Sequence, residues 1–263
     1  MKEIKSFKIY SNNNDKALNA TNIIKEKLIK NGLVESDEYD LAIAVGGDGS
    51  FLRMVKYTNF NSDCLYVGIN AGTLGFAQEV SLNNIDEFIK DIKNGNYKVD
   101  TIGVEKTKVV TNEGDSNFFS LNEIVIRDKD LNTAVLDVLV DDVYLEEYHG
   151  DGLLIATSFG STAYNLSFGG SIIYNTFHTL QITPIAPLNN KSYRSLLNSV
   201  VLPEDKLVKI IPKNKNILVT IDGENKIYDN VLYIETTIKE KRIKLLRSKD
   251  YDFSLKINEK FLK

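Results

Sequence analysis

Short apolar runs alternate with helical patterns over the first hundred residues. The runs typical of strands are Phe7–Tyr10, Leu41–Val45 and Leu65–Ile69. Leu41–Val45 is apolar on both faces, as expected for a strand in a parallel sheet that is covered on both sides. Helical spacing predicts short helices over Ser50–Lys56 and Ile85–Ile92. This βαβ order predicts an α/β N-terminal domain with a Rossmann-like parallel sheet over residues 1–100.

A longer helix is expected between the first two of these strands. Asp15 is placed to cap its start, and Asn31-Gly32 is placed to end it. The apolar side chains that we expect along it are Leu18, Ile23, Ile24 and Leu28.

After about Tyr97 the pattern changes to extended segments separated by turns. Residues 133–140 alternate, with Val135 on one face and Leu136, Val138 and Val140 on the other. The later segments of this kind are Val208–Ile211, Ile217–Ile221, Val231–Thr237 and Arg242–Leu246. The turn signals between them include Pro212, Asp222-Gly223 and Asp229-Asn230. A second, mainly β domain over residues 101–248 is therefore expected.

The composition is that of a globular protein without a nucleic-acid partner. The chain has 263 residues, 43% of them apolar, and a formal net charge of −4. Basic residues are spread along the chain, which argues against binding along a nucleic-acid backbone. The single cysteine, Cys64, excludes an intramolecular disulfide and a zinc site built on paired cysteines, and its apolar neighbours predict a buried position.

No targeting or membrane signal is evident in the sequence. The N-terminal stretch MKEIKSFKIYSNNND lacks the apolar core of a signal peptide, and no apolar run approaches the length of a membrane span. These features predict a cytoplasmic protein with no membrane partner.

A long segment of the second domain avoids charge. Between Gly152 and Asn190 there is no Asp, Glu, Lys or Arg, although these residues make up 26% of the chain. The segment is too rich in Gly, Ser, Thr, Asn and Pro to be a membrane helix. Its polar groups need partners in the protein, in a ligand or in another subunit, and simple burial in the core is the alternative explanation.

The stretch AVGGDGS follows the strand Leu41–Val45 and precedes a helix. Gly46, Gly47 and Gly49 would let the backbone approach a phosphate, and the helix offers unpaired N–H groups. Asp48 cannot attract a phosphate, but it could take a proton from an attacking hydroxyl or hold a metal ion. The alternative interpretation is a tight turn with Asp48 as the helix cap.

A second glycine-rich stretch, NAGTLGF, follows the third strand. Gly72 and Gly75 again allow close approach, and Phe76 offers a face for stacking on a base, with ordinary packing as the alternative. The loops that follow adjacent parallel strands emerge at the same edge of a sheet, where ligands bind. We therefore expect NAGTLGF and AVGGDGS to lie together.

Two further polar clusters lie in the second domain. In LNEIVI, Asn122 and Glu123 enter an apolar strand, so one of them must point inward unless the strand is bulged. An amide can pair with a base edge and a carboxylate with ribose hydroxyls, although a polar strand end explains the pair equally. In HGDGLLIATSFGSTAY, Asp151 precedes a strand, and the stretch from Gly160 to Tyr164 follows it with hydroxyl groups suited to a ligand's base, sugar and amide.

Taken together, these stretches resemble the NAD kinase family. GGDG at 46–49, the NxGxLGF-like run at 70–76, the Asn-Glu pair at 122–123, and GDG followed by GSTAY at 150–164 occur in family order. PIAPLNNKSYRS and IDGE, residues 184–195 and 221–224, resemble its downstream segments. GGDG alone also occurs in lipid kinases and phosphofructokinases, whereas the Asn-Glu pair with GSTAY is specific.

The resemblance implies ATP-dependent phosphorylation of NAD to NADP, with Mg²⁺ or another divalent metal and with NAD bound between the domains. It implies that Asp48 lies beside the adenosine 2′-hydroxyl as the catalytic base, as a metal ligand or as both. The phosphate cradle would be Gly46, Gly47, Gly49 and Gly72. The residues implied to bind NAD are Phe76, Asn122 and Thr162 at the adenine, Glu123 and Tyr164 at the nicotinamide ribose, Asp151 and Ala186 at the carboxamide, and Gly49, Ala163 and Ser167 without a more specific assignment.

The resemblance also implies a homodimer or homotetramer in which a neighbouring subunit shares the site, and a tail, residues 249–263, that returns to the first domain. His149 stands where the family commonly has arginine, so a contact there could depend on pH, unless His149 is a solvent-exposed strand end. Phe159 removes a hydroxyl that relatives often carry, and Glu224 has no assigned role. A GGDG-type lipid kinase and a non-catalytic NAD(P)-binding sensor remain the alternatives.

Overall fold

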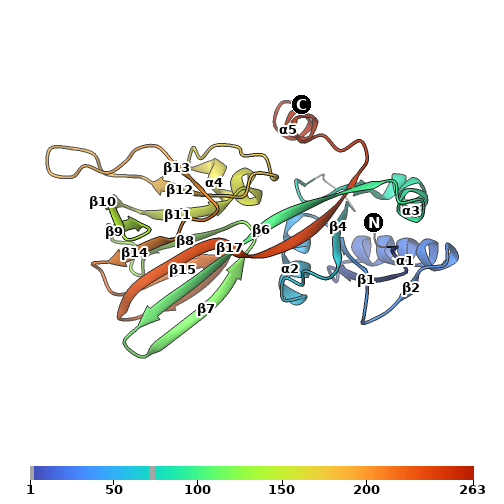
Figure 1. Ribbon diagram of the computed structural model, residues 1–263, viewed down its shortest axis with the longest axis horizontal. Helices are drawn as coiled ribbons and strands as arrows, with labels where there is room; N and C mark the ends of the chain where they lie inside the picture. The colour runs from blue at the N-terminus through green and yellow to red at the C-terminus, as the bar shows by residue number, and fades with distance from the viewer. Residues whose placement is uncertain (1–2, 71–74) are drawn as a thin grey trace. The chain divides into compact units, whose positions relative to one another are not determined.

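The computed structural model describes residues 3–70 and 75–263, which form two compact units (Figure 1). The first unit comprises Met1–Thr101 together with Arg242–Lys263, and the second comprises Ile102–Lys241. Two long paired strands, β6 (Tyr97–Thr111) and β17 (Val231–Ser248), each continue from one unit into the other. The last helix, α5 (Phe253–Phe261), belongs to the first unit although it ends the chain.

The first unit is built on the parallel sheet that the sequence predicts. Its order is β4-β3-β1-β2, and β4 also pairs with β5 and with the C-terminal end of β17, all in parallel. The strands are β1 (Ser6–Ser11), β2 (Val34–Glu35), β3 (Leu41–Val45), β4 (Leu65–Asn70) and β5 (Val80–Ser81). Cys64, just before β4, is buried as expected.

Helices cover both faces of this sheet. The helices are α1 (Asp15–Lys30), α2 (Asp48–Tyr57), the short η1 (Leu82–Asn84) and α3 (Ile85–Lys93). Leu41, Ile43 and Val45 of β3 pack in one apolar cluster with α1 and α3. Ala42 and Ala44 point to the opposite face, where α2 lies and where small side chains leave room for its buried Phe51 and Met54 (Figure 1). This double covering explains why every residue of β3 is buried.

The first helix differs from its prediction in its cap and its buried face. Asn14 is the cap, because its Oδ1 accepts a 2.9 Å hydrogen bond from the N–H of Ala17, and Asp15 is the first helical residue. The buried side chains are Ala17, Ala20, Ile24 and Leu28. Leu18 and Ile23 are 43% and 42% exposed, since each is one position, about 100°, away from that stripe.

The second unit is mainly β, as the sequence predicts, with antiparallel pairing. One sheet has the order β13 (Val200–Pro203), β12 (Thr179–Ile185), β11 (Gly152–Thr157), β8 (Glu123–Asp128), β15 (Ile217–Ile221) and β16 (Glu224–Tyr228). The other contains β10 (Val143–Gly150), β9 (Ala134–Val140), β14 (Val208–Pro212), the unit's part of β17, β6 and β7 (Gly114–Ser120). After β11 come the short helices η2 (Phe159–Thr162) and α4 (Tyr164–Ser167).

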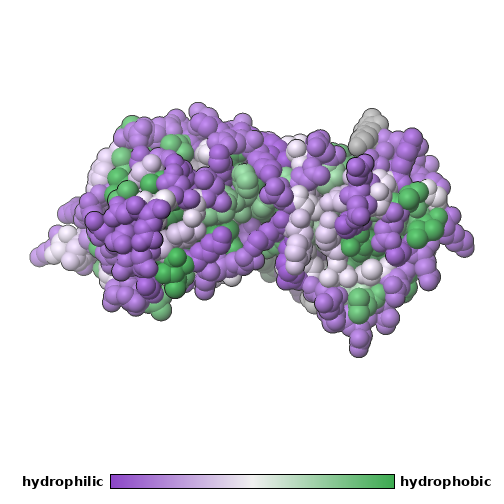
Figure 2. All heavy atoms as spheres, turned by 90° about the horizontal axis from the view of Figure 1, so that it is seen from below, coloured by the Kyte–Doolittle hydropathy of each residue, from purple (hydrophilic) through white to green (hydrophobic). Residues whose placement is uncertain are grey.

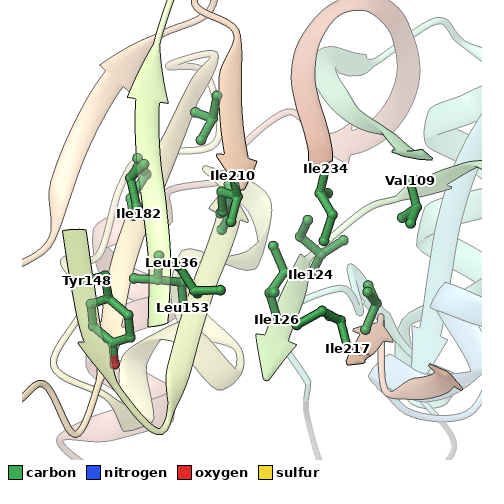
Figure 3. Packing of buried hydrophobic residues seen from close by; sticks show 14 of the residues in the cluster. Val109, Ile124, Ile126, Leu136, Tyr148, Leu153, Ile182, Ile210, Ile217 and Ile234 are labelled. Atoms are coloured by element: carbon green, nitrogen blue, oxygen red, sulfur yellow. The ribbon is translucent and has the colours of Figure 1, made fainter. Parts of the chain in front are cut away.

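The inward faces of these two sheets share a single apolar cluster. Leu136 and Ile210 come from one sheet and Leu153, Ile182 and Ile217 from the other, and all five belong to this cluster (Figure 3). Leu136 and Val138 of β9 are buried whereas Val135 is half-buried, which confirms the predicted alternation.

The prediction of two separate strands at residues 231–237 and 242–246 is wrong, because both belong to the continuous strand β17. No glycine or proline interrupts the sequence Ile238-Lys-Glu-Lys241 between them. The polar side chains of Lys239 and Glu240 are exposed along the strand, so they do not end it.

Core burial explains only part of the charge-free segment Gly152–Asn190. All of β11 and most of β12 are buried. Tyr174, Phe177 and Leu188 of this segment are exposed. Figure 2 shows one face of the molecule, on which hydrophobic residues lie in patches among hydrophilic ones. None of the helices among residues 3–70 and 75–263 combines the length and the hydropathy needed to cross a membrane.

Candidate functional site

The described residues of the two glycine-rich stretches, which exclude 71–74, lie at the same edge of the first unit's sheet, as predicted. Strands β3 and β4 are parallel neighbours, and Val45 pairs with Ile69 at their carboxyl ends. Just beyond, the N–H of Gly46 donates a 3.0 Å hydrogen bond to the carbonyl of Ile69. Gly46 has a φ of +141° and is packed against Ser50, so a larger residue would be strained and crowded there.

The Asp48 carboxylate joins the two stretches. Its Oδ2 accepts a hydrogen bond of 3.1 Å from the N–H of Phe76, and its Oδ1 accepts one of 2.9 Å from the N–H of Ala77. A Cβ on Gly75 would overlap this carboxylate. The helix-cap interpretation is wrong, because Gly47 is the cap residue of α2 and Asp48 points instead to the second loop.

The remaining glycines of the cradle leave space beside Asp48. A Cβ on Gly47 would meet nothing within 4 Å, and one on Gly49 would meet only the Arg53 guanidinium, 3.6 Å away, within the described part of the chain. Gly72 lies outside the described residues. Arg53 also donates hydrogen bonds to Asn12 and, at 3.3 Å, to Ser50. It brings a cation to this loop that was not among the predicted site residues, although its position four residues after Gly49 on a helix places the two on one face.

The C-terminal helix α5 contacts the same loop within the first unit. The ring of Phe76 lies 5.1 Å from that of Phe261 and 6.2 Å from that of Phe253, centroid to centroid, so packing accounts for part of its surface. Lys256 is 8% exposed and its Nζ donates a hydrogen bond to the carbonyl of Gln78. Nothing in the local sequence marked Lys256, because its position depends on the fold.

Burial lowers the pKa of the Lys256 ammonium to about 8. The neighbouring cation Arg247 lowers it further, whereas the carboxylates of Glu79, Asp48 and Glu259 oppose the shift. The Asp48 carboxylate is therefore one of the charges that act on the buried Lys256 amine.

In the second unit, Asn122 and Glu123 enter β8 as a half-buried and a buried residue. Glu123 is 6% exposed, which confirms that one member of the pair points inward. Burial raises the pKa of its carboxyl to about 8, nearby Asp222 and Glu105 raise it further, and a hydrogen bond from the backbone of Tyr164 opposes them. Its Oε2 is buried and has no hydrogen-bond partner among the described residues. A bound ligand that donates a hydrogen bond to this oxygen would supply the missing partner.

The GSTAY stretch packs directly on the Asn-Glu pair. The Thr157 hydroxyl donates a 2.5 Å hydrogen bond to the carbonyl of Leu121, and the Thr157 N–H donates one of 2.9 Å to that of Asn122. A Cβ on Gly160 would overlap the backbone of Asn122. The two motifs, at residues 122–123 and 160–164, are thus brought together, and Thr162 and Ala163 are half-buried.

Tyr164, the last residue of GSTAY, and Ser167, three positions later, are exposed. The Tyr164 hydroxyl accepts a 3.2 Å hydrogen bond from Nη2 of Arg127, and its ring meets Phe168 edge-on at 4.8 Å. The backbone of Tyr164 bonds the Glu123 carboxyl, so the orientation of this tyrosine is tied to the Asn-Glu pair.

Asp151 and Ala186 are also brought together. The N–H of Asp151 donates a 3.0 Å hydrogen bond to the carbonyl of Ile185, next to Ala186. A Cβ on Gly150 would lie 2.7 Å from the Ala186 carbonyl oxygen, so only glycine fits before Asp151. Both Asp151 and Ala186 are exposed, and Ala186 has a φ of +46°, a strained conformation that often marks a functional position.

His149 is not a solvent-exposed strand end. It is 9% exposed, its Nε2 lies 2.9 Å from Oε1 of Glu147, and its ring lies 4.3 Å from that of Tyr193. The prediction of exposure fails because the segment after β12 folds back over it: the N–H of Leu188 donates a 2.7 Å hydrogen bond to the His149 carbonyl.

The described part of the chain forms no metal site from protein ligands alone. Among residues 3–70 and 75–263, no three or more His, Cys, Asp or Glu side chains are grouped so that they could hold a metal ion. Mg²⁺ rarely needs such a cage, since it is usually held by one or two carboxylates together with substrate phosphates.

Comparison with family models matches both parts of the chain. The model of the ATP-NAD kinase N-terminal domain matches residues 8–97, and that of the ATP-NAD kinase C-terminal domain matches residues 121–245.

Similar proteins carry the same family name. The chain is 40% identical to the NAD kinase of Finegoldia magna, with 98% of each chain covered. It is 34% identical to NAD kinase 2 of Halalkalibacterium halodurans, with 91% of each covered. Among solved structures, yeast NADH kinase complexed with NADH has a TM-score of 0.84 at 18% identity, covering 99% of this chain and 88% of the other. An NAD kinase from Archaeoglobus fulgidus in complex with ATP has a TM-score of 0.70 at 20% identity, covering 92% of each. These two likenesses support the fold.

Proposed function

The chain belongs to the ATP-NAD kinase family, and we propose that it transfers the γ-phosphoryl group of ATP to the adenosine 2′-hydroxyl of NAD, giving NADP and ADP. The observation that carries this proposal is the Asp48 carboxylate, held by the N–H groups of Phe76 and Ala77 at the end of β3. A carboxylate fixed in a glycine-lined turn suits a reaction in which a hydroxyl must meet a phosphate.

In this proposal Asp48 is the general base. The 2′-hydroxyl gives its proton to the Asp48 carboxylate as its oxygen forms a bond to the γ-phosphorus. The bond from the γ-phosphorus to the bridging oxygen breaks, and that oxygen leaves with ADP. Enzymes catalyse phosphoryl transfer mainly by positioning the reactants and by neutralising charge. The two backbone hydrogen bonds to Asp48 would hold its carboxylate in position for this reaction.

The phosphates would lie along Gly46, Gly47, Gly49 and Gly72. The open space at Gly47 supports close approach by phosphate oxygens. Arg53, beside Gly49, would add a cation to the glycine-rich turn.

A divalent metal, Mg²⁺ in our proposal, would be held by the ATP phosphates and by Asp48. Each Asp48 oxygen accepts one backbone hydrogen bond and can still bind a further group. Asp48 therefore fits a site in which Mg²⁺ needs only one or two carboxylates besides the phosphates. Bound there, the metal would neutralise negative charge on the triphosphate.

We assign the NAD contacts as the family resemblance implies. The adenine would lie against Phe76, Asn122 and Thr162, and Gly49, Ala163 and Ser167 would contact NAD without a more specific assignment. Glu123 and Tyr164 would contact the nicotinamide ribose, and the unpartnered Glu123 Oε2 supports this role because a ribose hydroxyl can bond to it. Asp151 and Ala186 would contact the carboxamide, which the strained φ of Ala186 supports.

We also propose a cytoplasmic homodimer or homotetramer in which a neighbouring subunit shares the site. Exposed apolar side chains in and just after the charge-free segment support a covered surface. They are Tyr174, Phe177, Leu188, Leu197 and Val201.

One assay tests the proposed function. The purified protein is incubated with NAD, ATP and Mg²⁺, and NADP is detected with an NADP-specific dehydrogenase. Formation of NADP that depends on both substrates supports the kinase. Micromolar protein that binds NAD but forms no NADP would identify a sensor instead. ATP consumption on diacylglycerol vesicles without NADP formation would identify a lipid kinase.

A further inference from the structure

Asp222 occupies the turn between β15 and β16, where two residues reverse the chain. Asp222 and Gly223 have φ values of +44° and +87°, as the tight turns of two-residue hairpins require. Asparagine adopts this conformation as readily as aspartate does, so the turn itself does not need a carboxylate. The charged group therefore has another use.

The Asp222 carboxylate holds the backbone on which Asn122 and Glu123 stand. It accepts hydrogen bonds of 2.8 Å from the N–H of Leu121, 2.8 Å from that of Asn122 and 3.3 Å from that of Glu123. The N–H of Asp222 returns a 3.1 Å hydrogen bond to the carbonyl of Glu123. A carboxylate can accept all of these N–H groups, whereas an amide in its place would present an NH₂ group to some of them.

The opposite side of the same backbone is also fixed. Thr157 bonds the carbonyls of Leu121 and Asn122, and Gly160 packs on Asn122 without room for a Cβ. The backbone N–H and C=O groups of residues 121–123 are thus hydrogen-bonded by Asp222 on one side and by Thr157 on the other. Asn122 and Glu123 project from a backbone that has little freedom to move.

We propose that Asp222 is a positioning residue for NAD: its carboxylate fixes the backbone of Asn122 and Glu123, so that their side chains are in place before NAD binds. This inference rests on the proposed function, because it takes Asn122 and Glu123 as NAD contacts. Glu224, the other polar residue of IDGE, is exposed at the start of β16. Within IDGE the proposal gives a role to Asp222 and leaves Glu224 unassigned.

The test compares Asp222→Asn with the wild type in steady-state kinetics. The variant keeps a residue suited to the turn but loses the charge-assisted hydrogen bonds. We expect the KM and the Kd for NAD to rise about tenfold, while kcat and the KM for ATP change by less than about threefold. Amide hydrogen exchange at Leu121, Asn122 and Glu123 should quicken, whereas exchange in the middle of β15 should not.

Asp141→Asn is the matched control. Asp141 also begins a two-residue turn in the second unit, with a φ of +50°, and its carboxylate accepts a 2.9 Å hydrogen bond from the N–H of Leu207. We expect this variant to leave the KM for NAD unchanged.

Two outcomes would overturn the inference. An Asp222→Asn protein with wild-type KM for NAD and wild-type exchange at residues 121–123 would show that the carboxylate positions nothing. Equal losses in kcat and in the folded fraction, with an unchanged KM, would show a purely structural role. A wild-type protein that forms no NADP in the same assay would instead remove the proposed function, and this inference with it.

Discussion

The N–H of Ala77 donates a 2.9 Å hydrogen bond to Oδ1 of Asp48, which lies 29 positions earlier in the chain. This bond connects the loops that follow two adjacent parallel strands. It orients the Asp48 carboxylate through the backbone of another loop rather than through its own helix. Substitutions of Asp48 or of the residues around its carboxylate should therefore change turnover more than they change the stability of the fold.

Asp48→Asn should cut turnover by about 10²-fold or more while NAD affinity stays within several-fold, as expected for loss of a general base. The amide is close in size to the carboxylate and can still accept one of the two backbone N–H groups. The measurements are kcat by NADP formation and Kd by calorimetry, with the exposed Asp63→Asn as control. Nearly normal turnover in the variant would exclude Asp48 as the base.

Gly75→Ala should reduce turnover nearly as much as Asp48→Asn. The new Cβ would overlap the Asp48 carboxylate and turn it away from the N–H groups of Phe76 and Ala77. The change should be measured as kcat together with the thermal midpoint, because a large fall in stability would obscure the comparison. A fully active alanine variant would mean that the carboxylate can leave this position without loss.

The site loops show which features the sequence could predict. Apolar runs predicted strands β3 and β4, and the rule for parallel sheets then placed AVGGDGS and NAGTLGF at one edge, where Asp48 and Ala77 meet. Family resemblance supplied the candidate roles. Contacts between distant segments could not be predicted from the local sequence pattern. The burial of His149 depends on Leu188, and Lys256 of the last helix bonds to Gln78.

At Asn122 and Glu123, too, the sequence predicted the local structure but not the contacts with a distant segment, here Asp222. Its dipeptide predicted the turn between β15 and β16 correctly. Its three hydrogen bonds to residues 121–123, about a hundred positions away, follow only from the pairing of β15 with β8.

Arg247→Met should destabilise the first unit by about 3–5 kcal/mol, the usual effect of removing one partner of a buried ion pair. Arg247 is 1% exposed and lies 3.0 Å from Glu79 and 3.1 Å from Asp100, whose carboxylates would lose their partner. The control Lys206→Met breaks a more exposed 2.8 Å pair with Asp141 and should change stability by less than about 1 kcal/mol. Urea unfolding of both variants makes the comparison, and equal effects would contradict it.

Glu105→Gln should change how stability depends on pH. Glu105 is fully buried, and its carboxyl oxygens accept hydrogen bonds of 2.8 Å from Ser120 and 2.7 Å from Thr236. Burial raises its pKa from 4.5 to about 8, and the charge of Asp222 adds to the shift, although the two hydroxyls oppose it. The folded protein therefore keeps a proton on Glu105 over a pH range in which the unfolded chain has lost it.

The sign of the effect follows from this difference in bound protons. Between pH 4.5 and about 8 the folded state binds more protons at Glu105 than the unfolded state does, so the contribution of Glu105 to stability falls as pH rises. Glutamine does not titrate, and the stability of Glu105→Gln relative to the wild type should therefore increase across this range and level off above it. The measurement is the free energy of unfolding in urea at several pH values, with the exposed Glu113→Gln as control. A difference that stays constant from pH 5 to about 8 would mean that Glu105 is already ionised in the folded protein, with its charge stabilised by Ser120 and Thr236.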